Sequence, residues 1–124
     1  METTKPSIVI VEDEANIALA QKMILEERYD VHMAMDGEKG LELIKQVKPH
    51  VAILDVMMPK MNGFDLCRQI RSDEALSATK VVMVTAKNRQ QDEDQGIDLG
   101  AHDYIMKPFE DVELLHVVNQ VLNR

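Results

Sequence analysis

The sequence predicts the α/β fold class, with a parallel sheet of five strands covered by helices on both faces. Short runs rich in Val, Ile and Met alternate five times with segments that have helical spacing of apolar residues. The runs are nearly continuous in apolar residues, which is typical of strands buried on both faces. The chain has 124 residues, 45% hydrophobic and 29% charged, which suits one globular domain with its own core.

Each predicted strand is a run of four or five residues, an ordinary strand length. The runs, in chain order, are SIVIV (7–11), DVHMA (30–34), VAIL (51–54), KVVMV (80–84) and DYIM (103–106). Because a helical segment follows each strand, the strands are expected to lie parallel in a (βα)5 arrangement. We expect the strand order 2-1-3-4-5, which is common in open parallel sheets.

Helical spacing of apolar residues predicts a helix after each strand. The predicted helices cover residues 16–27, 37–47, 63–72, 89–99 and 110–122. Lys48-Pro49 and Gly100 are ordinary helix stops before the third and fifth strands. The segment KNRQQDEDQG (87–96) contains no apolar residue, so we expect the fourth helix to be weakly anchored and mobile.

Composition restricts the functions open to the chain. A net charge of −8 repels nucleic acid phosphates and anionic lipid, so we expect no direct nucleic acid binding and no membrane binding. No apolar run could span a bilayer and the start METTKPS lacks a signal pattern, so a cytoplasmic protein is expected. We expect a single domain over residues 1–124, with its core at about 7–122 and no effector domain in this chain. The lone Cys67 cannot form an internal disulfide and is expected in the core.

Polar residues stand at the carboxyl ends of four of the predicted strands. Glu12 and Asp13 follow the first predicted strand, Asp55 follows the third, Thr85 the fourth and Lys107 the fifth. Ligands of open parallel sheets bind beyond the carboxyl ends of the strands, at the point where the strand order reverses. In the order 2-1-3-4-5 this point lies between the first and third strands, so the five side chains should converge there.

The convergent residues suit phosphoryl chemistry. Three carboxylates ~5 Å apart repel by about 3 kcal/mol per pair at an effective dielectric of 20, so the cluster requires a cation. Oxygen ligands alone favour magnesium, and no loop here has the regular ligand spacing of a calcium site. A carboxylate nucleophile, a hard cation, a lysine and a hydroxyl together are what an aspartyl phosphate needs.

Each of these residues also has an ordinary structural explanation. Asp13 alone could cap a helix that begins at Ala15 or Asn16. Thr85 alone could be a plain strand residue, and Lys107 a solvated lysine before a proline. Five such groups, each within two residues of a strand end, favour the functional explanation.

Four motifs make the chain similar to a known family. They are VEDE (11–14), LDVMMPKMNG (54–63), VTA (84–86) and GAHDYIMKPF (100–109). With these motifs the chain resembles the receiver domain of bacterial two-component response regulators, from Ile8 to the last helix. The resemblance implies a flavodoxin-like fold and a phosphoprotein that acts in signal transduction or a phosphorelay, not a dedicated enzyme.

The resemblance implies a role for each residue of the site. Asp55 would accept a phosphoryl group from the phosphohistidine of a histidine kinase or phosphotransfer protein, or from a small phosphodonor. Asp13, Asp55 and the backbone carbonyl of Met57 would bind Mg²⁺ directly, with Mn²⁺ as a possible substitute. Glu12 would help through a water molecule, and Lys107 would pair with the phosphoryl oxygens.

The resemblance also implies a switch. Thr85 would move to hydrogen-bond the phosphoryl group, Tyr104 would turn inward, and the small Ala86 would leave room. Tyr104 could equally be a half-buried strand tyrosine in both states. Neither Met57 nor Lys87 can readily orient an attacking water, so we expect slow self-dephosphorylation.

Partner surfaces follow from the first helix and the residues after the fifth strand. One apolar helix face consists of Ile17, Ala20, Ile24 and Leu25. On another, Ala15, Leu19 and Met23 could dock a kinase helix bundle together with Pro108 and Phe109, or could merely fill gaps under a neighbouring helix. The fourth helix, fifth strand and last helix would form the output surface toward an effector domain or downstream protein.

The last helix, EDVELLHVVNQVLNR, has one cation, Arg124. Receivers that dimerise through this surface use paired charges, so we expect a monomer or a weak phosphorylation-dependent dimer.

Two other functions compete with a phosphoacceptor. A haloacid-dehalogenase phosphatase would need a second acid two residues after the nucleophile, where this chain has Met57. An interaction module without phosphorylation would usually have lost one of the five polar groups. The nine methionines and four histidines show no metal-ligand spacing, and no Gly-rich phosphate loop is present.

Overall fold

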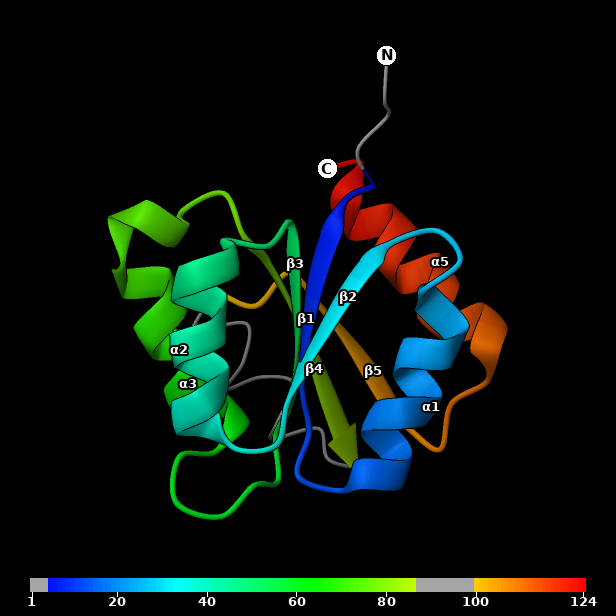
Figure 1. Cartoon of the computed structure of the whole chain (residues 1–124), viewed down its shortest axis with the longest axis horizontal. Helices are drawn as coiled ribbons and strands as arrows, with labels where there is room; N and C mark the ends of the chain where they lie inside the picture. The colour runs from blue at the N-terminus through cyan, green and yellow to red at the C-terminus, as the bar shows by residue number, and fades with distance from the viewer. Residues whose placement is uncertain (1–4, 87–99) are drawn as a thin grey trace.

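A computed structural model of the chain describes residues 5–86 and 100–124. Its five strands form one parallel sheet in the order β2-β1-β3-β4-β5 (Figure 1). The predicted fold class and strand order are therefore confirmed. The carboxyl ends of all strands lie at one end of the molecule, as parallel strands require, and this arrangement positions the site described below.

Two strands have the predicted bounds, and three are longer at their carboxyl ends. The strands are β1 (Ser7–Val11), β2 (Asp30–Ala34), β3 (Val51–Asp55), β4 (Lys80–Ala86) and β5 (Asp103–Lys107). The extra residues of β3, β4 and β5 are polar or small, so hydrophobic periodicity did not include them. They nevertheless continue the sheet, since Asp55 is in register with Val84 and Ala86 with Lys107.

Four helices and one short 3-10 turn connect or follow the strands. They are α1 (Ala15–Leu25), α2 (Gly37–Val47), α3 (Gly63–Ser72), η1 (Glu74–Leu76) and α5 (Asp111–Leu122). The helix predicted at 89–99, its expected mobility and Lys87 lie outside the described residues. The turn η1 was not predicted; the Asp73 side chain accepts a hydrogen bond from the Ala75 amide and so begins it.

The helices cover the sheet in two layers. In Figure 1, α1 and α5 lie on one face and α2 and α3 on the other. The alternation of β1 follows this division, because Ile8 and Ile10 pack toward the α1/α5 layer while Val9 and Val11 pack toward the α2/α3 layer. Cys67 is fully buried in the second layer, as expected, and burial raises the pKa of its thiol to about 11.

The buried face of α1 differs from the prediction. Ala18, Gln21 and Leu25 are buried, whereas Ala20, expected in the apolar core face, is exposed. Gln21 is only 1% exposed although it is polar. The prediction counted only apolar residues, so the predicted core face is rotated away from the face that α1 actually buries. Ile17 and Ile24 are half-buried at the edge of the helix contact.

Helix ends are set by local hydrogen bonds at α2 and α3. Asp36 accepts from the Lys39 amide at 2.7 Å, and Asn62 accepts from the Asp65 amide at 2.9 Å. At α1 the N-cap is Glu14, with no side-chain cap bond, so Asp13 is not the cap that its position suggested. The Asp13 carboxylate is therefore left for another role. In the described part of the chain, none of the helices combines the length and apolar character that crossing a membrane requires.

Candidate functional site

Three carboxylates meet beyond the carboxyl ends of β1 and β3. Glu12, Asp13 and Asp55 each place a carboxylate oxygen within 4.8 Å of the others. Pairing of Val11 with Leu54 makes the two strands neighbours, so the residues that follow face each other. Glu12 is 1% exposed and Asp55 4%, whereas Asp13 is open to solvent. The predicted convergence of the acidic residues is thus present, and one side of it is accessible.

Lys107 provides positive charge to this cluster. Its Nζ lies 3.1 Å from Oε1 of Glu12 and 3.3 Å from Oδ1 of Asp55. Burial opposes the charge on Lys107, but the hydrogen bond to Glu12 and the two carboxylates outweigh it and raise the pKa of Lys107. The Glu12–Lys107 pair was not predicted, because a lysine and a glutamate 95 positions apart give no sequence signal of contact.

Glu12 is held in an environment that disfavours its charge. Burial raises the pKa of Glu12 to about 7, and the Asp55 carboxylate adds to the rise. The Glu14 amide donates to Oε2 of Glu12 at 3.2 Å and, with Lys107, offsets part of the shift. Near neutral pH this carboxyl therefore carries a proton part of the time, and a cation bound beside it would displace that proton.

The loop between β3 and α3 is closed tightly behind Asp55. The Gly63 amide donates to the Val56 carbonyl at 3.1 Å, and the Val56 amide donates to Val84 of β4 at 2.9 Å. A Cβ on Gly63 would lie 2.4 Å from the Asp55 carbonyl oxygen, so only glycine fits there. The Met57 amide approaches Oδ1 of Asp55 at 3.4 Å, while the Met57 side chain is exposed.

Thr85 and Tyr104 lie on the strands beside the acidic cluster. Thr85 is fully buried near the end of β4, in register with Met106. Tyr104 is half-buried and packs against the core layer under α2 and α3. The two residues predicted to form the switch are therefore on adjacent strands, and Tyr104 is in register with Met83, two residues before Thr85.

A groove runs along α1 to the loop that follows β5. Its lining consists of Asn16, Ile17, Ala20, Ile24, Lys107, Pro108, Phe109 and Asp111. The predicted docking residues Pro108 and Phe109 line this groove, whereas Leu19 and Met23 do not, and their exposed fractions are 49% and 64%. Ala15 is also exposed. The Lys107–Pro108 peptide is cis.

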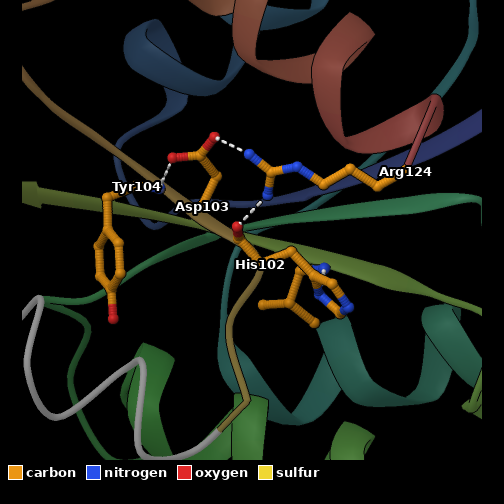
Figure 2. A network of polar contacts seen from close by, with 5 residues as sticks. His102, Asp103, Tyr104 and Arg124 are labelled. Carbon is orange, nitrogen blue, oxygen red and sulfur yellow. Dashed lines mark hydrogen bonds and ion pairs between the residues drawn. The ribbon is translucent and has the colours of Figure 1, made fainter.

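The start of β5 is held by a second polar network, at the opposite end of the sheet (Figure 2). Arg124 donates to the His102 carbonyl and pairs with Asp103 at 3.3 Å, and the Tyr104 amide donates to Asp103 at 2.8 Å. The His102 ring accepts the Val81 amide on Nδ1 at 3.0 Å. Arg124 is thus used within the chain, to join the end of α5 to β5.

Comparisons with known proteins agree with this geometry. The family model "Response regulator receiver domain" matches residues 8–119. The transcriptional regulator RpaA of Synechocystis is 42% identical over 120 residues, which is 96% of this chain and 50% of RpaA. The response regulator ArlR of Staphylococcus saprophyticus is 42% identical over 118 residues, 94% of this chain and 52% of ArlR. The chain spans about half the length of the curated relatives it matches.

Solved structures give the same result. The chemotaxis protein CheY4 of Vibrio cholerae superposes with a TM-score of 0.90 at 27% identity, covering 95% of this chain and 99% of CheY4. The beryllofluoride-activated DrrB receiver domain superposes with a TM-score of 0.86 at 31% identity, covering 98% of this chain and all of that one.

Proposed function

The chain belongs to the response regulator receiver domain family, and we propose that Asp55 is the residue at which it accepts the phosphoryl group. The observation that carries the proposal is the placement of Asp55, which ends β3 with two further carboxylates within 4.8 Å and the Lys107 ammonium at 3.3 Å. A nearly buried carboxylate that lies close to two other carboxylates and to an ammonium group is suited to form an acyl phosphate.

The reaction transfers a phosphoryl group from the donor to the Asp55 carboxylate. An oxygen of the Asp55 carboxylate attacks phosphorus, and the bond from phosphorus to the donor nitrogen or oxygen breaks, with the electron pair leaving on the donor. Later attack by water on phosphorus breaks the new bond and restores the carboxylate. The carboxylate oxygen is the nucleophile, and the Lys107 ammonium lies 3.3 Å from Oδ1 of Asp55.

The acidic cluster is suited to a hard cation. Asp13, Asp55 and the Met57 carbonyl would hold Mg²⁺, with Mn²⁺ as a substitute and Glu12 acting through water. When bound, the ion supplies charge neutralisation for the transferring phosphoryl group. The residues present fit such an ion. The accessible carboxylate of Asp13 lies beside the buried carboxylates of Glu12 and Asp55, and among the described contacts these two share a single ammonium, that of Lys107.

Lys107 and Thr85 would stabilise the phosphorylated state. The Lys107 ammonium needs to move only from the Asp55 carboxylate to a phosphoryl oxygen attached to the same side chain, and Glu12 keeps it nearby. The Thr85 hydroxyl, near the end of the adjacent β4, would donate a hydrogen bond to a phosphoryl oxygen. Tyr104 would then fill the space that the Thr85 side chain leaves. Phosphorylation would thereby change the surface around β5 and α5.

The phosphodonor would be a histidine kinase or a phosphotransfer protein that docks beside the site. The groove along α1, whose lining includes Ile17 and Phe109, supports docking there, and the exposed Leu19 and Met23 offer further apolar surface on the same helix. Relatives such as MtrA are described as DNA-binding response regulators, and this chain corresponds to about half of each. We propose that output in the whole protein passes to an effector domain or a downstream protein, without nucleic acid or membrane contact by this chain.

A phosphatase function is not favoured, because the exposed Met57 side chain cannot act as a general acid. The proposal is tested by the intact mass of the protein after incubation with acetyl phosphate, with and without Mg²⁺. Wild type should gain one phosphoryl group only with Mg²⁺, and Asp55→Asn should gain none. A folded wild-type protein that binds Mg²⁺ but is modified neither by acetyl phosphate nor by any phosphorylated kinase would instead be an interaction module.

A further inference from the structure

The loop that carries Met57 is supported from outside by the first residue of α2. Gly37 is buried and opens that helix directly after the cap residue Asp36. A Cβ built on Gly37 would lie 2.5 Å from the Met61 carbonyl oxygen and 2.7 Å from the Met61 Cβ. Both are positions that cannot be vacated by a side-chain rotation, so the close approach of helix and loop depends on glycine.

The helix cannot easily move away to make room. Its second glycine, Gly40, lies against β1, where a Cβ would be 2.7 Å from both methyl groups of Val11. Ile44 of the same helix is fully buried in the core layer. At its N-terminus, Asp36 is fixed by the bond to the Lys39 amide, and the preceding strand is fixed because Ala34 accepts from the Glu12 amide at 3.1 Å.

The loop cannot easily move either without changing the site. It is closed at its far end by the bond from Gly63 to the Val56 carbonyl. Within the loop, Met58 is buried in the core. A shift of Met61 would therefore be taken up between residues 56 and 62, where the Met57 backbone is in contact with Asp55.

We propose that Gly37 is a positioning residue for the phosphorylation site. By letting the α2 backbone lie against Met61, it fixes the loop at 56–62 and hence the position of the Met57 backbone, whose amide contacts Asp55. The inference rests on the proposed function, in which the Met57 carbonyl would bind the cation. Gly37 itself touches neither phosphate nor metal.

The test compares Gly37→Ala with wild type. The first measurement is the amide NMR spectrum without metal, in which changes should be concentrated at residues 56–62. The second is calorimetric Mg²⁺ binding, which should weaken by about tenfold, the usual effect of disturbing a group that orients a metal ligand. Phosphoryl gain from acetyl phosphate should slow in parallel.

A matched control separates positioning from general destabilisation. Ile44→Val leaves the Gly37 contact intact and should lower stability by about 1 kcal/mol, so its Mg²⁺ affinity should stay at the wild-type value. A folded Gly37→Ala protein with wild-type Mg²⁺ affinity and unchanged amides at 56–62 would overturn the proposal. If wild type itself bound no Mg²⁺, the proposed function would fail and this inference with it, so the two failures are distinguishable.

A second pair of variants serves if Gly37→Ala does not fold. Met61→Gly removes the Cβ that packs against Gly37 and should weaken Mg²⁺ binding. Lys60→Gly adds the same flexibility one residue away, at a φ that glycine adopts readily, and should not weaken it. Equal Mg²⁺ affinities for Met61→Gly and Lys60→Gly would contradict the role of this contact.

Discussion

Glu12 combines burial, an acidic neighbour and a cationic partner in one side chain. Its pKa of about 7 in the folded protein lies above the ordinary 4.5. A raised pKa stabilises the fold only while the proton is bound, so its contribution is complete below pH 4.5 and is lost as the pH rises through about 7. At higher pH the ionised, buried carboxylate destabilises the metal-free protein.

We therefore expect Glu12→Gln to be more stable than wild type at pH 8, by roughly 1–3 kcal/mol, and no more stable at pH 4. Urea unfolding in EDTA at both pH values measures this difference. Glu14→Gln, at an exposed side chain, is the control and should be neutral. A Glu12→Gln protein that is no more stable at pH 8 would show that Lys107 compensates the charge fully.

Lys48 ends α2 in a left-handed conformation, with a φ of 50°. A side chain at that φ is strained, whereas glycine is not, so Lys48→Gly should stabilise the protein by roughly 0.5–1 kcal/mol. The thermal midpoint measures the change. Lys45→Gly, within the last turn of the same helix, should have the opposite sign, and a loss of stability in both variants would argue against strain at Lys48.

At the scale of single residues, the sequence predicted that polar side chains gather at one end of the sheet, but not which of them are in contact. Asp55, Asp13, Glu12, Thr85 and Lys107 all follow or end strands, so their common location could be predicted from the strand order alone. The pairing of Lys107 with Glu12 could not be predicted, since it depends on side-chain geometry between β1 and β5, which are separated in the sheet by β3 and β4. Nor could the capping of α1, because several acidic residues precede that helix.

At the scale of elements, apolar periodicity predicted where strands begin better than where they end. β3, β4 and β5 continue past the last apolar residue because backbone hydrogen bonds to a neighbouring strand do not require an apolar side chain. Among these extra residues are Asp55, Thr85 and Lys107, for which we propose roles in phosphoryl transfer. In α1, the core face was predicted wrongly because Gln21 is polar but buried, and apolar periodicity assumes that polar residues face solvent.

The junction of β4 and β5 gives a pH dependence of its own. Burial lowers the pKa of His102 below the ordinary 6.5, with further lowering by the cations Arg71, Lys80 and Arg124. The unfolded chain therefore takes up the proton first, and stability falls as the pH decreases below 6.5. The bond from the Val81 amide requires the neutral ring, because a protonated Nδ1 cannot accept.

His102→Asn should retain an acceptor for the Val81 amide but lose the titration. The loss of stability between pH 7 and pH 5 should then be smaller than in wild type, as measured by urea unfolding across that range. His116→Asn, on the exposed side of α5, should leave the pH dependence as it is. If His102→Asn kept the full pH dependence, other groups would have to carry it.

At the scale of the whole molecule, two core layers hold a sheet whose carboxyl end bears like charges close together. A cation that binds only the folded chain stabilises it by mass action, by about 2.7 kcal/mol at a concentration a hundred times its dissociation constant. Asp13→Asn should lose most of this Mg²⁺-dependent stabilisation. It should also be slightly more stable than wild type without Mg²⁺, because one repulsive charge has been removed.

Thermal unfolding with and without Mg²⁺ measures both effects. Glu42→Gln, an exposed acid on the outer face of α2, changes the net charge equally and should leave the Mg²⁺ effect unchanged. If Asp13→Asn is more stable than wild type without Mg²⁺ but less stable with it, the acidic cluster is the cation site. Equal Mg²⁺ effects in wild type and Asp13→Asn would place the ion elsewhere.

Chemical trapping identifies the side chain that carries the phosphoryl group, which we propose to be Asp55. An acyl phosphate is reduced by borohydride, which converts an aspartyl phosphate into homoserine. Wild-type protein treated with acetyl phosphate and Mg²⁺, reduced, digested and sequenced by mass spectrometry should contain homoserine at position 55 alone, and none when Mg²⁺ is omitted. Homoserine at position 13, or a phosphoryl group gained without homoserine at position 55, would contradict the claim.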